Sequence, residues 1–218
     1  MGNRIWGSMA GRLAGHLVGR VAALALAVAA LAVPAGAALA CEKLVDMPTP
    51  RIEEMMEVLK DNSGGSELKQ LLAFEELACS SRPAVRKFAL DTGLASKSKP
   101  LRSQSFAALL MQRDQIRMDL LEELKGDRTM EMWIRNNGRS LAYKFHNKDA
   151  AQNCISLSPS YKCPGTQMIA IDGLNIRIID PQRHLTGTFA LQPDNSLRGT
   201  ILVKRASRPV AAKIELEK

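Results

Sequence analysis

Histidine, aromatic residues and metal-binding patterns are scarce in this chain. Only 4% of its 218 residues are aromatic, and only His146 and His184 of its three histidines lie beyond residue 40. None of its four cysteines forms a Cys-x-x-Cys pair, so the ligand spacing of a zinc site is absent. The glycine-rich stretch Gly64-Gly65-Ser66 lacks the lysine and the spacing of a nucleotide-binding loop. The sequence therefore predicts neither a metal site nor a cofactor.

Patterns for catalysis are missing as well. The Glu75-Glu76 and Glu122-Glu123 pairs are adjacent in sequence, and adjacent side chains on a helix point about 100° apart. No Gly-x-Ser-x-Gly motif is present. A histidine and a carboxylate lie close in sequence at Asp180 and His184, within a segment typical of a turn between two strands. We therefore assign no catalytic residue, and we keep as an alternative an envelope hydrolase assembled around Asp180 and His184.

The first 40 residues have the three parts of a secretory signal. Residues 1–20 contain three arginines and no acidic residue, residues 21–33 are apolar throughout, and Ala38 and Ala40 are small residues before the expected cleavage site. The apolar run is shorter than the ~20 residues that span a bilayer. We predict a signal peptide over 1–40, a mature chain that begins at Cys41, and a periplasmic or secreted location of the Gram-negative type.

The position of Cys41 leaves a lipoprotein open as an alternative. Bacterial lipoproteins carry their lipid on a cysteine that directly follows the cleavage site, but leucine usually stands three residues before that cysteine, where Ala38 is found here. Membrane association is therefore expected only if Cys41 is lipidated or if the signal is not cleaved.

All four cysteines lie in the part of the chain that we expect to be exported. An even number of cysteines in an oxidising compartment predicts two disulfides. Cys154 and Cys163 are close in sequence and have a turn pattern between them, so they are expected to pair, which leaves Cys41 for Cys79. Each bridge is expected to contribute about 2–4 kcal/mol to stability.

Residues 41–112 are predicted to be helical. Proline and small polar residues open helices at Thr49-Pro50, near Ser66, at Pro83 and at Pro100, and leucine, methionine and phenylalanine follow at helical spacing. The first of these helices carries a methionine-containing apolar stripe, which is typical of core packing. Gly93 is the expected end of the third helix.

Two of these segments share a pattern. Residues 83–90 and 100–107 both begin with proline, continue with an early arginine and contain a Phe-Ala step. The first, together with the helix before it, resembles one unit of a HEAT-type helical repeat. The resemblance describes how these helices are expected to pack, and it covers too few units for a complete solenoid.

Residues 113–218 are predicted to be mostly β-structure with one short helix. Ile116, Met118 and Leu120 alternate with polar residues, which favours a strand over about 115–121, although a single long helix is the alternative. A short helix is expected over about 128–137. Alternating segments joined by short turns, such as Asp172-Gly173, follow from residue 140 onward. The chain is thus predicted to be α+β: packed N-terminal helices, loosely HEAT-like, and a C-terminal antiparallel meander of five or six strands.

Positive charge is concentrated towards the C-terminal end. The formal net charge is +8, and the predicted last two strands contain a cluster of cations: Arg198, Lys204, Arg205, Arg208 and Lys213. Such a cluster fits an anionic partner, and it also fits edge strands that carry charge against aggregation. The cations do not alternate with aromatic side chains, as a nucleic-acid surface would require.

Together these patterns favour a non-enzymatic binding or adaptor module over an enzyme. Its expected partner is a protein or an anionic component of the cell envelope, and nucleic acid is excluded by the compartment. The expected binding surface is the helical layer or the basic residues of the last two strands.

Overall fold

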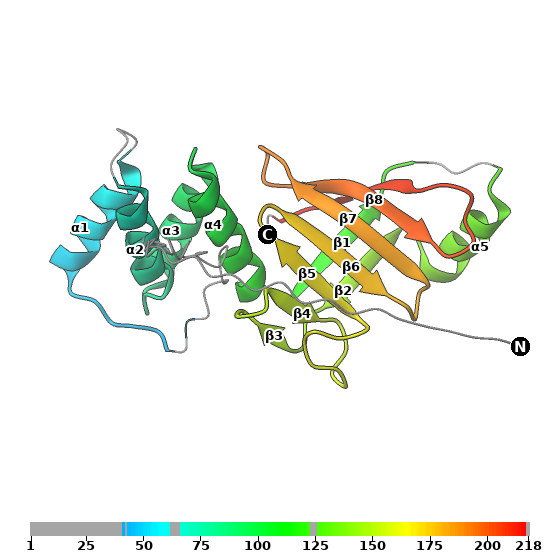
Figure 1. Ribbon diagram of the computed structural model, residues 1–218, viewed down its shortest axis with the longest axis horizontal. Coiled ribbons are helices and arrows are strands. Elements are labelled where there is room, and N and C mark those ends of the chain that lie inside the picture. The colour runs from blue at the N-terminus through cyan, green and yellow to red at the C-terminus, as the bar shows by residue number, and fades with distance from the viewer. Residues whose placement is uncertain (1–40, 42, 62–65, 123–125, 217–218) are drawn as a thin grey trace, which may run out of the picture. The chain divides into compact units, whose positions relative to one another are not determined.

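The computed structural model describes residues 41, 43–61, 66–122 and 126–216 of the chain (Figure 1). The predicted signal peptide, residues 1–40, lies outside the described residues. The described elements begin with four helices, and a fifth lies between the first two strands. Their bounds are α1 Thr49–Lys60, α2 Glu67–Ala78, α3 Pro83–Ala95, α4 Lys99–Gln112 and α5 Arg128–Asn137.

The helices begin where the sequence places proline or a capping residue. Proline lies in the first turn of α1, α3 and α4, where its missing N–H group costs no helical hydrogen bond. Ser98 caps α4, since its hydroxyl accepts a hydrogen bond from the N–H of Leu101 at 3.3 Å. Gly138 follows the last residue of α5 with φ of 83°, and the helix has the bounds expected for the short helix over about 128–137.

The β-region forms one antiparallel sheet of nine described strands, more than the five or six expected. The strands are β1 Gln115–Leu120, β2 Ser140–Lys144, β3 Lys148–Asp149, β4 Cys154–Ser156, β5 Met168–Asp172, β6 Asn175–Asp180, β7 Leu185–Leu191, β8 Leu197–Val203 and β9 Val210–Ile214. Their order in the sheet is β2-β1-β9-β8-β7-β6-β5-β4-β3. From β3 to β9 the order is a meander, as predicted. Of the strands beyond the predicted meander, β1 was expected separately, and β3 and β4 are too short to show an alternating pattern.

The ambiguous segment after α4 is a strand. Ile116, Met118 and Leu120 are buried in β1, whereas Gln115 and Arg117 are exposed, as the two-residue period predicts. The β1 strand lies out of chain order in the sheet. One of its neighbours is β2, the next strand in the chain, and the other is β9, the last strand. This insertion joins the start of the β-region to its end.

The sheet is curled into a half-barrel (Figure 1). Its two outermost strands, β2 and β3, are consecutive in the chain and are joined by residues 145–147 alone. The link also continues the hydrogen bonding, because the His146 N–H donates to the Ser156 carbonyl at 3.0 Å and the Ser156 N–H donates to the Asn147 carbonyl at 2.7 Å. The curl places one face of the sheet inside.

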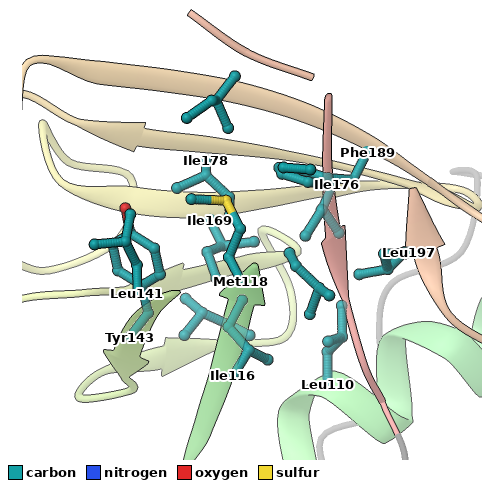
Figure 2. Packing of buried hydrophobic residues seen from close by; sticks show 14 of the residues in the cluster. Leu110, Ile116, Met118, Leu141, Tyr143, Ile169, Ile176, Ile178, Phe189 and Leu197 are labelled. Carbon is teal, nitrogen blue, oxygen red and sulfur yellow. The ribbon is translucent and has the colours of Figure 1, made fainter. Parts of the chain in front are cut away.

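The described chain has two hydrophobic cores, and helices α3 and α4 contribute residues to both. Residues of α1 to α4 form the first core, including Phe74, Leu77 and Leu101. The second lies on the inner face of the sheet, where side chains from β1, β2, β5, β6, β7 and β8 meet Leu110 of α4 (Figure 2). Helix α4 is buried on two sides, because Leu101 and Ala108 lie in the first core and Phe106, Ala107 and Leu110 lie in the second.

Both expected disulfides are present in the structure. Cys41 is bonded to Cys79, which ties the residues before α1 to the end of α2. Cys154 is bonded to Cys163 and closes the loop between β4 and β5. Two such bridges are typical of an oxidising, extracytoplasmic compartment.

Among the described helices, none combines the length and the apolar character needed to cross a membrane.

Gly93 does not end α3, as the sequence suggested, but lies inside it. The helix continues to Ala95, and a Cβ atom at residue 93 would lie 1.9 Å from Ser105 Oγ and 2.9 Å from Ser105 Cβ. Ser105 is fully buried in α4, where its hydroxyl donates to the Leu101 carbonyl at 2.8 Å. The glycine is therefore required by the close approach of α3 to α4.

We predict that Gly93→Ala destabilises the protein by about 1–3 kcal/mol, the usual cost of overpacking. Helix propensity alone predicts the opposite, a gain of about 1 kcal/mol. Urea unfolding followed by circular dichroism measures the difference. Adding Ser105→Ala removes the hydroxyl that the new methyl group meets, so the double variant should recover part of the loss. An unchanged or increased stability of Gly93→Ala would show that the two helices are not in close contact here.

Candidate functional site

Asp180, one of the two residues proposed for a hydrolase site, is fully buried at the end of β6. Its carboxylate accepts a hydrogen bond from Arg183 Nη1 at 2.9 Å, from the Arg183 backbone N–H at 3.3 Å and from Gln167 Nε2 at 3.1 Å. A buried carboxylate needs such an ion pair and such hydrogen bonds to remain charged. The partners of Asp180 are thus residues of its own turn and of the segment before β5.

The Asp180–Arg183 pair belongs to a larger cluster that joins three parts of the fold. The Arg183 guanidinium lies 5.0 Å from the centre of the Tyr143 ring in β2, and the Arg183 carbonyl accepts a hydrogen bond from Trp133 Nε1 of α5 at 2.7 Å. Burial, and then the negative charge of Asp180, raise the pKa of Tyr143 above its usual range. The cluster therefore holds α5 and β2 against the turn between β6 and β7.

Two polar atoms of this cluster are buried without a hydrogen-bond partner among the described residues. They are the Tyr143 hydroxyl and the Gln167 Oε1 atom. Buried polar groups normally have a partner, in protein or in ordered water. Sequence analysis did not identify either residue, because each lies in a stretch that is otherwise typical of a strand or a loop.

His184 is not brought to the Asp180 carboxylate. Its side chain is exposed, and its backbone has φ of 53° in the turn that follows β6. No hydrogen bond or ion pair joins the two side chains in the described part of the chain. The His184 carbonyl instead accepts a hydrogen bond from the Lys204 N–H at 2.8 Å, which places the β6–β7 turn beside the connection between β8 and β9.

The five predicted cations fall into two separate groups. Arg198 and Lys213 are register partners near the start of β8, whereas Lys204, Arg205 and Arg208 lie in the connection between β8 and β9. Lys204 lies six positions after Arg198 along β8 and its end, a distance of roughly 20 Å at ~3.3 Å per residue. The cations therefore do not form one continuous patch.

Carboxylates accompany the first group. Arg198 Nη2 lies 3.4 Å from Asp194 Oδ2, and Lys213 Nζ lies 2.5 Å from Glu215 Oε1. Hydrogen bonds from Ser196, and then the charges of Arg198 and Lys213, lower the pKa of Asp194. The positive charge of this group is largely balanced by its neighbours.

The second group lies on a connection that is anchored to α5. We call residues 204–209, with Lys204, Arg205 and Arg208, the basic loop. Within it, the Ser207 N–H and hydroxyl donate to Asp127 Oδ2 at 2.9 and 2.5 Å. Asp127 also caps α5, since its Oδ1 accepts a hydrogen bond from the Met130 N–H at 3.1 Å. One carboxylate thus fixes both the start of the helix and the basic loop.

Anchoring the basic loop to α5 brings further cations to the same end of the sheet. Arg128 directly follows Asp127 and is exposed, as are Lys204 and Arg205. Arg208 Nη1 lies 3.6 Å from Glu122 Oε2 and is the one loop cation with an ion-pair partner among the described residues. Positive charge therefore exceeds negative charge around this loop. Sequence reasoning identified the loop cations but not Asp127, the residue that positions them.

Comparisons of this chain with protein-family models, with curated proteins and with solved structures give no match. The class of protein is therefore defined by the fold alone, an α+β chain with an antiparallel half-barrel.

We predict that Asp127 makes stability depend on pH. Hydrogen bonds from Ser207 first, and then from Met130, lower the pKa of Asp127 to about 2, below the ~3.9 of an unfolded chain. A lowered pKa means that the contribution to stability is present above pH ~4 and is lost as the pH falls towards 2. Urea unfolding from pH 7 to pH 2, followed by Trp133 fluorescence, should show a shallower acid loss for Asp127→Asn.

Asp172→Asn serves as the matched control for this experiment. Asp172 is an exposed aspartate at the β5–β6 turn, and the described structure gives its carboxylate no hydrogen bond or ion pair. The control should keep the acid loss of the unmodified protein. Equal slopes in both variants would mean that Asp127 does not hold the basic loop in solution.

Proposed function

We propose that this protein is exported to the periplasm or secreted, and that it is a non-enzymatic binding module that holds an anionic partner through the basic loop. The partner is a protein or an anionic component of the envelope. The proposal is supported by two disulfides, which are typical of an oxidising compartment, and by the signal-like residues 1–40. The binding surface rests on the geometry of the basic loop.

The position of β8 and β9 in the sheet is the observation that carries the proposal. Cations on these strands have an alternative explanation if the strands are at an edge, where charge prevents aggregation. The sheet order places β8 between β7 and β9, and β9 between β8 and β1. Since both are interior strands with a partner strand on each side, the charges of their connection have no edge to protect.

The anchored basic loop is also suited to binding. Ordering a flexible loop on binding costs about 0.5–1.5 kcal/mol for each long side chain that is immobilised. The Ser207–Asp127 hydrogen bonds hold the loop backbone against α5 before a partner arrives. The exposed cations Lys204 and Arg205 are therefore held in place, and their positive charge increases the rate of encounter with an anionic surface.

The helical layer is the other surface proposed from the sequence. The HEAT-like resemblance of α2 and α3 stays a prediction. Two exposed leucines, Leu68 and Leu72, lie one turn apart on α2 and are 64% and 51% exposed. They would be the contact residues if the partner used this layer.

We predict that Lys204→Glu with Arg205→Glu abolishes binding of the partner. The experiment is crosslinking of the tagged full-length chain in cells, followed by capture from the envelope fraction. Arg177→Glu with Arg198→Glu is the control, because it makes the same change in charge on the outer face of β6 and β8. A partner retained by the control and reduced at least about tenfold by the loop variant supports the proposal. Equal loss in both variants would point to net charge alone, and equal retention to another surface.

A hydrolase centred on Asp180 and His184 is the second candidate. It is favoured by the cluster around the buried Asp180, in which the pKa values of Tyr143 and Arg183 are raised, since groups with perturbed pKa values are frequent at functional sites. It is weakened by the exposed imidazole of His184, which has no contact with Asp180.

We predict that His184→Asn leaves folding and partner capture unchanged. Asparagine tolerates the positive φ of this position, which alanine does not. An exposed substitution of this kind normally changes stability by less than about 0.5 kcal/mol. Thermal unfolding checks the fold, and the cellular phenotype of the variant checks the function. Loss of the phenotype with an intact fold would favour the hydrolase over the binding module.

A further inference from the structure

Two exposed leucines lie at the end of the sheet that carries the basic loop. Leu202, near the end of β8, is 46% exposed, and Leu121, directly after β1, is 53% exposed. Strand β9 lies between β8 and β1 in the sheet, and it begins at Val210, directly after the basic loop. The two leucines therefore lie on either side of the point where the basic loop returns to the sheet.

Both leucines point away from the core of the half-barrel. Each is preceded by a buried residue, so alternation along the strand places it on the outer face. The Leu121 N–H donates to the Ala211 carbonyl at 3.0 Å, which continues the pairing of β1 with β9. Ala211 is also the register partner of Thr200, two residues before Leu202. This register places the two leucines on one face, roughly 12 Å apart.

Cations lie next to these leucines. Lys204 follows Leu202 by two residues, and its N–H donates to the His184 carbonyl at 2.8 Å, which continues the strand pairing by one residue. Arg205 comes next in the basic loop, and Arg128 of α5 is held beside the loop by the hydrogen bonds between Asp127 and Ser207 (Figure 1). Within the described part of the chain, Lys204, Arg205 and Arg128 are all exposed, and none of them forms an ion pair.

This combination of side chains is typical of a protein that lies on an anionic lipid surface. Such proteins place lysine and arginine at the phosphate head groups and aliphatic side chains at the boundary with the acyl chains. Protein–protein interfaces are instead enriched in aromatic residues and depleted in lysine. Tyr161 is the one exposed phenylalanine, tyrosine or tryptophan among the described residues, and it lies between β4 and β5. The side chains around the basic loop therefore fit a lipid surface better than a protein.

We propose that the basic loop holds the protein on an anionic phospholipid surface, with Lys204, Arg205 and Arg128 at the head groups and Leu121 and Leu202 at the boundary with the acyl chains. This inference rests on the proposed function, since it identifies the anionic envelope component. The contact requires neither an uncleaved signal nor a lipid on residue 41, which is bonded to Cys79. Each cation near such a surface strengthens binding about fivefold, so the attachment is reversible and weakens as salt is added.

Vesicles of equal parts phosphatidylglycerol and phosphatidylcholine are the probe for this surface. The protein is residues 41–218 with both disulfides formed, because the apolar residues 21–33 would bind lipid by themselves. Co-sedimentation at low salt should show binding to these vesicles that is at least about tenfold tighter than binding to phosphatidylcholine alone. Equal binding to both kinds of vesicle, or binding to neither, would overturn the proposal.

Leu121→Gln with Leu202→Gln tests the two leucines. Affinity for the anionic vesicles should fall at least about tenfold, since burying a leucine side chain contributes that much. Leu68→Gln with Leu72→Gln is the matched control, because it removes two leucines of α2 that are equally exposed, and it should bind as the unmodified protein does. Circular dichroism checks that both variants are folded. Unchanged affinity in the first variant, or the same loss in the control, would contradict the proposal.

Leu202→Trp gives a measurement that does not depend on a loss of binding. Trp133 is the one other tryptophan after residue 40, and it is buried, so a change in emission reports on residue 202. Anionic vesicles should shift the emission to shorter wavelength, as expected for an indole that enters the lipid interface. Leu72→Trp should show no shift. Bound protein without a shift at residue 202 would show that this side chain does not reach the lipid.

Lys204→Glu with Arg205→Glu separates this inference from the proposed function. Loss of vesicle binding in this variant, without a crosslinked protein in the envelope fraction, supports the lipid surface. If the unmodified protein ignores vesicles but captures a protein that this variant loses, the partner is an acidic protein and only the lipid inference fails. If the variant changes neither vesicle binding nor capture, both proposals fail.

Discussion

A short link between the two outermost strands is the constraint on which the rest of the β-region depends. Nine strands spaced by ~4.8 Å would put β2 and β3 about 38 Å apart in a flat sheet. Residues 144 to 148 reach at most ~14 Å. The sheet must therefore curl until its ends approach each other, and the inserted strand β1 determines which strands meet. The inner face becomes a core because the curl leaves it no access to water.

The curl explains why a buried ion pair is found in a chain with so few other buried charges. β2 is an end strand of the sheet, and the pair Asp180–Arg183 approaches it through the ring of Tyr143. Trp133 holds α5 to the same turn. Breaking a fully buried pair costs about 3–5 kcal/mol, and the cost is lower here because the Arg183 side chain is 35% exposed. These contacts favour one closure of the half-barrel. This structural role accounts for the position of Asp180 without a catalytic one.

Local features of the fold could be predicted from the sequence, and long-range pairing could not. The positions of proline predicted the starts of α1, α3 and α4, and the two-residue period predicted β1. The number and spacing of the cysteines predicted both disulfides. The pairing of β1 with β9 joins segments about 90 residues apart, and no local pattern encodes it. Gly93 was misinterpreted for the same reason, because its role depends on Ser105 of another helix. The five cations were predicted to form one patch because they are close in sequence. Strand β8 separates Arg198 from Lys204, so they form two groups.

The basic loop connects two strands that are held firmly in the sheet. Leu197 and Ile201 of β8 are fully buried, and the strand is paired on both sides. Its β9 partner contributes Val210 and Ile214, which are also fully buried. A core packed in this way resists gradual deformation. Binding at the basic loop is therefore expected to leave the sheet unchanged, because the buried strands that flank the loop also keep the half-barrel closed.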